Sequence, residues 1–221
     1  MGMRGLLEMK IASLQGNYLP WTGVFELIHS VDKFIFSDNN QFTKQDWRNR
    51  NLIKTDNGKL WLTVPVYKQR IDTKIIDIKI CNEANWKKKH YKSFCQYYSK
   101  LKYFNQYKHL LDFYEHDWEY LYELNRYTTK DICNTLDIDT EFYYSEDFPE
   151  DINLLKDKNE KIIRRVKELG GTHYISGPKA KNYIDEELWK KNNIKLEYID
   201  YKTKNTFTVL DNIFNNGIDI L

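Results

Sequence analysis

Cysteine and net charge are both scarce in this chain of 221 residues. Its three cysteines, Cys81, Cys95 and Cys133, form no C-x-x-C pair and lack the spacing of metal ligands. A sparse and odd count of this kind indicates free thiols in a reducing compartment. Lysine and arginine together number 34, and aspartate and glutamate 32. The chain therefore lacks the basic field that marks nucleic-acid-binding proteins, and we expect no nucleic-acid partner.

Long apolar runs are also missing, because no stretch approaches the ~18 consecutive apolar residues of a membrane span. Residues 1–8 are too short and too weakly apolar for a signal peptide, and we interpret them as an extension that is disordered or was added for expression. We expect a cytoplasmic protein without membrane insertion. No internal repeat or low-complexity linker divides the rest. Residues 9–221 are predicted to form a single α/β domain with a helical insertion at about 85–140.

Short apolar segments bounded by polar residues predict the strands. They are residues 10–14, 33–37, 60–66, 172–176 and 196–201, with the alternating segment 74–81 as a sixth that pairs with 60–66. The sequence Asp56-Asn57-Gly58-Lys59 is a turn signal, because asparagine and glycine accept positive φ. It predicts that the strand before Asp56 pairs with residues 60–66.

Helical spacing of apolar and aromatic residues dominates the middle of the chain. The predicted helices are 85–114, 117–136, one from Asp151 to Gly170-Gly171 and one from about Lys179, with a short turn at Asp185 or Glu186. Residues 143–149 lack periodicity, which predicts a long loop. We therefore expect an α/β fold with a mostly parallel sheet flanked by helices, and a helical middle section that forms a cap or subdomain. Right-handed crossovers would place the loops after residues 14, 37 and 176 on one rim of the sheet.

The loop after residues 10–14 carries three candidate ligand-binding side chains, Gln15, Asn17 and Tyr18. Amides and a phenol bind neutral polar groups such as sugar hydroxyls through directed hydrogen bonds. The N-terminus of the helix behind the loop favours an anion such as phosphate. The loop is neither a P-loop nor a G-x-G-x-x-G motif, and a structural turn in which Asn17 caps the helix accounts for it equally well.

A second cluster begins with Asp38, which follows residues 33–37 and could orient a hydroxyl or act as a base. Arg50 offers a planar fork for phosphate or carboxylate, and with Lys44 and Arg48 it forms a positive site that suits a nucleotide diphosphate. A salt bridge from Arg50 to Asp46 or Asp38 is the structural alternative. The remaining candidates of this cluster are Gln41, Asn49 and Trp47, whose flat face suits a sugar or a base.

His90 is the strongest candidate for proton transfer, because an ordinary imidazole pKa of about 6.5 suits acid–base catalysis near neutral pH. Taken alone, a helical histidine of this kind is more often structural. Ser176, Gly177 and Tyr183 form a third cluster, in which no G-x-S-x-G motif supports a serine nucleophile. We expect Gly177 to expose backbone N–H groups and Ser176 to donate a hydrogen bond. No HExxH, H-x-H or paired cysteine occurs, so no metal site is predicted.

Several ordered segments resemble one known family. They are QGNYLPWTGVFELI at 15–28, DKFIFSDNNQFTKQDWRNRN at 32–51, WLTVPV at 61–66, Lys89-His90 with Tyr98 and Tyr103-Phe104, Tyr174-Ile175-Ser176-Gly177 with Tyr183, and Leu210-Asp211. This pattern is similar to the WbqC-like family, bacterial proteins encoded among the genes for O-antigen and related surface polysaccharides. Gly16 departs from that family, which usually has proline at this place.

The resemblance implies an enzyme that acts on a nucleotide-linked amino sugar before polymer assembly, with amide formation by acyl or aminoacyl transfer to the sugar amine. His90 or Asp38 would take the amine proton, while Gln15, Asn17 or the Gly177 backbone would stabilise the oxyanion. Arg50 with Lys44 would hold the diphosphate, and an acyl thioester or ATP would serve as co-substrate. The alternatives are a non-catalytic protein that binds a sugar or polysaccharide intermediate, and a nucleotidyltransferase suggested only by the strand–loop–helix start. The sequence leaves a homo-oligomer open.

Overall fold

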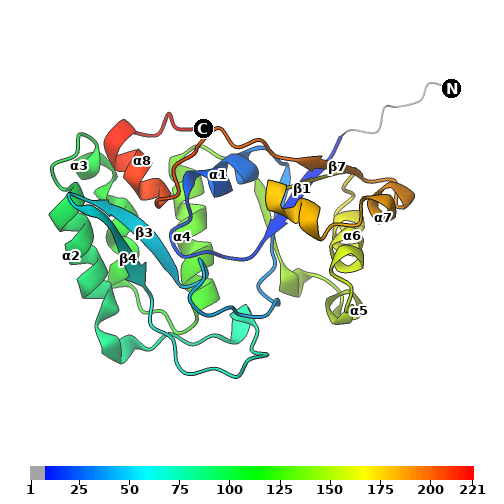
Figure 1. The fold of residues 1–221 in the computed structure, drawn as a ribbon, viewed down its shortest axis with the longest axis horizontal. Helices are drawn as coiled ribbons and strands as arrows, with labels where there is room; N and C mark the ends of the chain where they lie inside the picture. The colour runs from blue at the N-terminus through cyan, green and yellow to red at the C-terminus, as the bar shows by residue number, and fades with distance from the viewer. Residues whose placement is uncertain (1–7) are drawn as a thin grey trace. The chain divides into compact units, whose positions relative to one another are not determined.

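A five-stranded parallel sheet organises the computed structural model, which describes residues 8–221. The strands follow the order β5-β2-β1-β6-β7, and every neighbouring pair is parallel. Their bounds are Lys10–Leu14 for β1, Lys33–Phe36 for β2, Glu141–Tyr144 for β5, His173–Ser176 for β6 and Lys195–Tyr198 for β7. Helices flank the sheet and fill the middle of the chain (Figure 1). The predicted α/β fold is confirmed.

The chain divides into two compact units. The described part of unit 1 comprises residues 8–14, 27–37 and 140–201, and unit 2 comprises residues 15–26, 38–139 and 202–221. Unit 1 contains the parallel sheet, whereas unit 2 contains the helical middle section. Helix α1 (Thr22–His29) begins in unit 2 and ends in unit 1. No helix within residues 8–221 combines the length and the apolar character needed to cross a bilayer.

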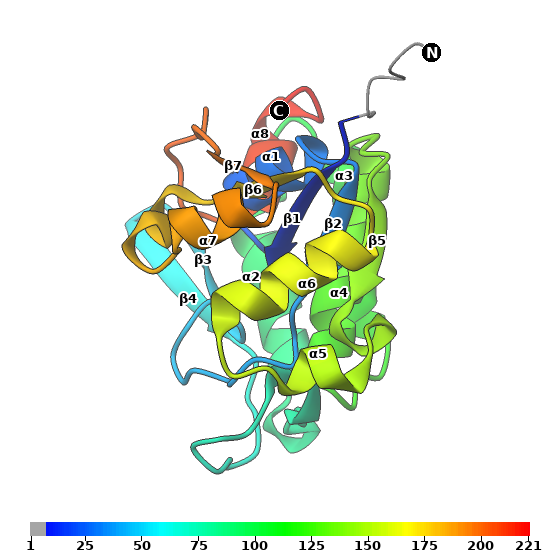
Figure 2. The same cartoon turned by 90° about the vertical axis from the view of Figure 1, so that its right-hand side faces the viewer.

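Helix α6 (Lys158–Glu168) covers one face of the sheet in unit 1 (Figure 2). Its Ile163 and Val166 pack with Ile11 of β1 and Ile35 of β2. The rest of this core consists of Phe148, Tyr174, Trp189 and Ile194. The rings of Tyr174 and Trp189 stack with centroids 4.5 Å apart, so that α7 (Glu186–Lys191) is fixed against β6.

The paired glycines after α6 end the helix and lead into β6, as the sequence predicts. Gly170 has a φ of +72°, the left-handed conformation that glycine adopts readily at a helix end. A β-carbon at Gly171 would lie 2.6 Å from side-chain atoms of both Ile11 and Val166. Both neighbours are fully buried. Gly171 therefore permits the close approach of the helix end to β1.

Replacing Gly171 with alanine should lower the free energy of unfolding by about 1–2 kcal/mol, since overpacking forces buried neighbours to shift. Urea denaturation measures this loss. Adding Ile11→Val removes the contacted Cδ1 methyl group, and the double variant should recover part of the cost of the glycine substitution. Strictly additive losses would show that the contact is not the cause.

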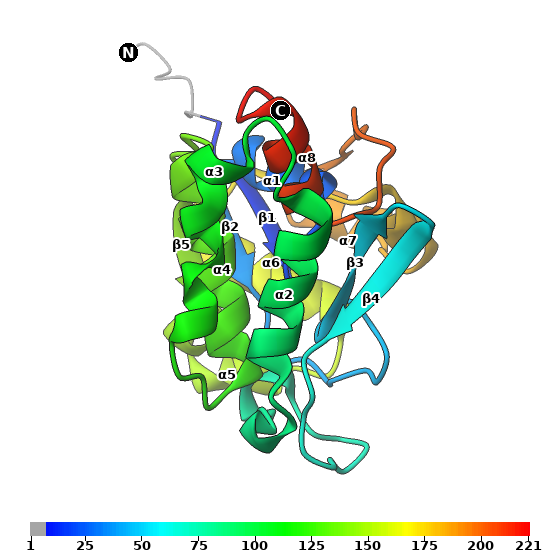
Figure 3. The same cartoon turned by 90° about the vertical axis from the view of Figure 1, so that its left-hand side faces the viewer.

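Unit 2 combines a two-stranded hairpin with helices (Figure 3). The hairpin strands are β3 (Arg50–Thr55) and β4 (Gly58–Thr63), which pair antiparallel. The helices of this unit are α2 (Trp86–Tyr98), α3 (Phe104–Tyr107), α4 (Leu121–Thr135), α8 (Val209–Asn216) and a 3-10 helix at Lys108–Glu115. The turn predicted at Asp56-Asn57-Gly58-Lys59 and the pairing across it are confirmed, with Gly58 at a φ of +130°.

One strand prediction was wrong, and the bounds of another differ. Residues 74–81 form no continuous strand but a 3-10 turn at Ile75–Asp77, with isolated antiparallel bridges at Lys74, Lys79 and Ile80. The bridge of Ile80 is to Val66, so the predicted pairing with residues 60–66 is limited to this contact. Ile75 and Ile78, three residues apart across the turn, are both fully buried, and Ile80 is buried two residues further on. The predicted strand 60–66 ends at Thr63 and belongs to the hairpin, outside the parallel sheet.

The loop predicted at 143–149 was also wrong in its first part, because Tyr143 and Tyr144 belong to the edge strand β5. Aromatic pairing explains this strand, since Phe36 of β2 stacks on both Phe142 and Tyr144. Three predicted helices also differ. The helix at 85–114 breaks after Tyr98, the one from Asp151 is split into α5 (Glu150–Leu154) and α6, and the one from Lys179 is a 3-10 turn at Pro178–Asn182.

Candidate functional site

The loop after β1 belongs to unit 2, where Arg48 joins its two amide side chains. The guanidinium donates one hydrogen bond to Gln15 Oε1 over 2.9 Å and another to Asn17 Oδ1. The side chain of Arg48 is 14% exposed. Burial lowers its pKa, an effect opposed by the charges of Asp46 and Asp38. A half-buried cation thus holds two of the predicted ligand-binding residues in one place.

Buried asparagines fix the backbone of this loop. Asn125 of α4 donates to the carbonyl oxygens of Gly16 (3.2 Å) and Arg48 (2.9 Å). Asn51 of β3 donates to the carbonyl oxygen of Leu19 over 2.6 Å, where Leu19 adopts a φ of 43°. Such a conformation is uncommon for leucine and persists only when its surroundings enforce it. The loop therefore has one defined shape set by α4 and the hairpin.

Asp38 is fully buried and bonds to two parts of unit 2. Its Oδ1 accepts a hydrogen bond from the backbone N–H of Gly16 over 2.8 Å, and its Oδ2 accepts one from Arg126 Nε over 2.7 Å. The guanidinium of Arg126 also lies over the ring of Tyr122, 4.6 Å from its centroid. Both carboxylate oxygens are engaged, so the observed contacts of Asp38 position the loop. Its predicted role as a base stays a prediction.

His90 lies on α2 within a buried polar chain. Its Nδ1 is 2.8 Å from the hydroxyl of Tyr18, which is 2.6 Å from the hydroxyl of Tyr114. Burial lowers the pKa of His90 to about 4, with the charge of Lys89 acting in the same direction and a hydrogen bond to the Thr63 backbone opposing it. The imidazole is therefore neutral at pH 7. In the tautomer whose other ring nitrogen donates to the Thr63 backbone, Nδ1 accepts a hydrogen bond from the Tyr18 hydroxyl.

The other residues predicted for the second cluster have separate surroundings within unit 2. The guanidinium of Arg50 lies 4.2 Å from the ring centroid of Trp61, and Trp47 lies 5.4 Å from that ring. Trp47 and Trp61 are 38% and 39% exposed. Asn49 is buried and donates to the Val64 carbonyl oxygen. Lys44 and Gln41 are exposed, and Gln41 bonds to the carbonyl of Ile71.

The third cluster belongs to unit 1. Ser176 is the last residue of β6 and is buried, and Gly177, directly after it, is half-buried. Tyr183 is 64% exposed, beyond the 3-10 turn. The structure thus joins Gln15, Asn17, Tyr18, Asp38 and His90 through shared contacts in unit 2, whereas the third cluster is a feature of unit 1.

Sequence reasoning missed the partners that organise this loop, Arg48 as its bridging cation, Tyr114, Asn125 and Arg126. One signal was available for Asn125. It lies four residues after Leu121, and both are buried on the face by which α4 packs. A polar residue on the apolar face of a predicted helix indicates a specific hydrogen-bond partner.

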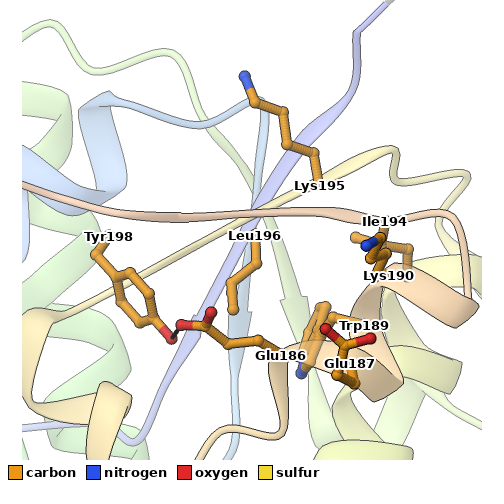
Figure 4. Close-up of a pocket in the computed structure, with 8 residues that line it drawn as sticks. All are labelled: Glu186, Glu187, Trp189, Lys190, Ile194, Lys195, Leu196 and Tyr198. Carbon is orange, nitrogen blue, oxygen red and sulfur yellow. Dashed lines mark hydrogen bonds between the residues drawn. The ribbon is translucent and has the colours of Figure 1, made fainter.

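A surface pocket of about 360 Å³ lies beside α7 and β7 in unit 1 (Figure 4). Its lining mixes charges, with Glu186 and Glu187 beside Lys190 and Lys195, and the Tyr198 hydroxyl donates to Glu186 over 3.0 Å. It includes none of the residues predicted from the sequence. Among residues 8–221, no three His, Cys, Asp or Glu side chains are placed to hold a metal ion.

Comparison with known proteins supports the resemblance carried by the motifs. The model of the WbqC-like protein family matches residues 15–221. The chain is also 36% identical over 215 residues to the uncharacterised protein Rv1507c of Mycobacterium tuberculosis, an alignment that covers 96% of this chain and 91% of that protein. A search of solved structures gave no match. The loop held by Arg48 and the polar chain through His90 are therefore features of a protein that belongs to the WbqC-like protein family.

Proposed function

We propose that this protein is an enzyme that binds a nucleotide-linked amino sugar and forms an amide by acyl or aminoacyl transfer to the sugar amine. The observation that carries the proposal is the Arg48 guanidinium held between the side-chain oxygens of Gln15 and Asn17. Asp46 Oδ2 lies 3.8 Å from the Arg48 guanidinium and balances part of its charge. The hydrogen bonds of Arg48 to neutral amides still leave the guanidinium able to attract an anionic ligand.

Binding would use the charge of Arg48 and the amide nitrogens beside it. Because the oxygens of Gln15 and Asn17 face Arg48, their NH₂ groups are the free donors of these side chains. A diphosphate offers acceptor oxygens to such donors and two negative charges to the guanidinium. In this proposal Arg48 replaces Arg50 as the main phosphate-binding residue, because Arg50 is stacked on Trp61.

The chemical step would join the sugar amine to an acyl carbon and release the leaving group of the acyl donor, an acyl thioester or an acid activated with ATP. The proton lost by the amine would pass to the departing thiolate or phosphate. The amide N–H groups that do not bind the diphosphate would donate to the oxyanion that forms on the acyl oxygen. The neutral His90, linked to Tyr18 over 2.8 Å, would hold that phenol in position. Asp38 would hold the loop backbone at Gly16 and so preserve the geometry of the donors.

A second candidate function is binding of a sugar or polysaccharide intermediate without turnover. One observation favours it, namely the half-exposed pair Trp47 and Trp61 beside Arg50 on the hairpin. Exposed aromatic rings can stack on sugar faces. The two functions differ in their products. Incubation with a UDP-linked amino sugar and an acyl thioester or ATP plus acid should yield a covalent amide, detected by mass spectrometry, only for an enzyme.

Replacing Arg48 with alanine should weaken binding of a UDP-linked amino sugar about 10- to 100-fold, because hydrogen bonds to a charged group contribute about 1.5–3 kcal/mol. Isothermal titration calorimetry measures the dissociation constant. Arg70→Ala is the matched control, since the Arg70 side chain is 89% exposed and pairs with Asp72 at the surface. Equal affinities for the wild type and Arg48→Ala, or no binding of any nucleotide sugar by the wild type, would refute the proposal.

A further inference from the structure

Unit 1 contains a buried arginine that forms no ion pair with any described residue. Arg165 of α6 is 1% exposed. Its Nη1 donates to Ser37 Oγ over 3.0 Å and its Nη2 to Asn153 Oδ1 over 2.5 Å, both neutral groups. Burial lowers the pKa of Arg165 to about 10, against the opposing charge of Glu146. A buried cation without a paired anion is costly, so its charge calls for a further partner.

Two hydrogen-bond donors, one on Arg165 and one on a neighbouring serine, lack an acceptor among the described residues. The first is Arg165 Nε, which is buried and has no hydrogen-bond partner. The second follows from counting hydrogens. Ser13 Oγ and Ser37 Oγ lie 2.6 Å apart and share one hydrogen bond, while Ser37 also accepts from Arg165. Two hydroxyls carry two hydrogens, so one O–H of the pair remains free to donate. The positive charge of Arg165 beside these donors favours an acceptor that carries negative charge.

The serine hydroxyls lie at the carboxyl ends of the strands, where a parallel sheet usually binds its ligand. From β1 the chain continues outward through β2 and β5, whereas β6 and β7 lie on the opposite side of β1. The order therefore reverses between β1 and β6, and ligands of open α/β sheets bind at the carboxyl ends of the strands at such a reversal. Ser13 lies near this end of β1, Ser37 directly follows β2, and Ser176 ends β6.

A shared neighbour brings Ser176 into the same cluster. Burial raises the pKa of Tyr174, whereas the nearby Ser176 side chain and Ser13 backbone lower it. Both serines therefore lie within reach of one phenolic oxygen. Ser13 is half-buried, and so is Gly177 directly after Ser176. The cluster thus combines hydroxyl donors near the surface with a buried positive charge behind them.

We propose that Ser13, Ser37 and Ser176, supported by Arg165, form a binding site for the phosphate group of a small molecule. Phosphate suits this arrangement because several oxygens can each accept from a different strand end, while the guanidinium balances the charge. The site lies wholly within unit 1. The inference does not depend on the function proposed for the Arg48 site.

Titration of the full chain with inorganic phosphate, followed by ³¹P NMR, tests this inference. Ser13→Ala should weaken phosphate binding about tenfold or more, the loss expected for one hydrogen bond to a charged group. Ser13→Ala leaves the contacts of Arg165 with Ser37 and Asn153 in place, so its melting temperature should stay close to that of the wild type. Ser176→Ala should weaken binding in the same way.

Two control variants show whether phosphate binds at these serines or elsewhere on the protein. Ser99→Ala, at the exposed end of α2, should leave phosphate affinity unchanged. Arg70→Ala, at an exposed position of unit 2, should also leave it unchanged. The inference is overturned if the wild type shows no saturable phosphate binding, if Ser13→Ala and Ser176→Ala bind as the wild type does, or if only Arg48→Ala loses affinity.

Discussion

Replacing Asp38 with alanine should lower the free energy of unfolding by about 3–5 kcal/mol, one of the two largest effects we expect. The carboxylate is fully buried and accepts hydrogen bonds from Gly16 and from Arg126 over 2.7 Å. Removing it leaves the Arg126 charge in a largely buried position without this partner, and it also leaves the Gly16 N–H without its acceptor. Urea denaturation at pH 7 measures the loss.

Asp72→Ala is the matched control, because Asp72 forms an ion pair with Arg70 at the surface, where both side chains are mostly exposed. Such exposed pairs contribute little, so the change should stay within about 1 kcal/mol. Asp38→Asn keeps the size and one acceptor oxygen but removes the charge, and it should be nearly as destabilising as alanine. Wild-type stability in Asp38→Ala together with lost amide formation would instead identify Asp38 as a catalytic base.

The stability of the wild type should fall by about 3 kcal/mol between pH 6.5 and pH 4 through His90 alone. Burial lowers the pKa of His90 to about 4 in the folded chain, whereas an unfolded histidine has a pKa near 6.5. Between these values the unfolded chain binds a proton that the folded chain does not. The contribution of the neutral His90 to the free energy of unfolding is therefore fully present above pH 6.5. It is lost as the pH falls towards 4, at about 1.36 kcal/mol per pH unit.

The variant His90→Gln isolates this effect, because glutamine does not titrate. Carboxylates also titrate in this range, so the informative quantity is the difference in unfolding free energy between wild type and variant at each pH. That difference should shrink by about 3 kcal/mol from pH 7 to pH 4. His29→Gln, at an exposed position of α1, is the control and should give a curve parallel to the wild type. If the stability curves of His90→Gln and the wild type are parallel across this pH range, the wild-type His90 imidazole is not desolvated.

The local parts of the fold could be predicted because their causes lie within a few residues. The strand Lys10–Leu14 was predicted with its exact bounds, and the hairpin turn followed from Asn57-Gly58. The edge strand β5 was missed, since its pairing with β2 is set by aromatic contacts more than 100 residues apart in sequence. Residues 74–81 alternate like a strand, yet the burial of Ile75 and Ile78 favours a turn.

In the loop after β1, the residues could likewise be predicted from the sequence but their distant partners could not. Gln15, Asn17, Tyr18 and Asp38 could be singled out as polar residues at strand ends, and His90 as a titratable group in a family motif. Their partners could not, because Asn125 and Arg126 lie 109 and 88 residues from the groups that they bind. Nor did the sequence distinguish Arg48 from Arg50, since both are arginines in one short basic segment.

By itself, the sequence determined the family, the α/β class and the residue types that the loop after β1 offers to a ligand. Only the tertiary structure decided which side chains each arginine contacts. Arg48 lies in the turn before β3 and reaches Gln15 and Asn17, whereas Arg50 begins the strand and stacks on Trp61. The physical reason is that backbone conformation directs each side chain, and two residues of the same type on different conformations point to different surroundings.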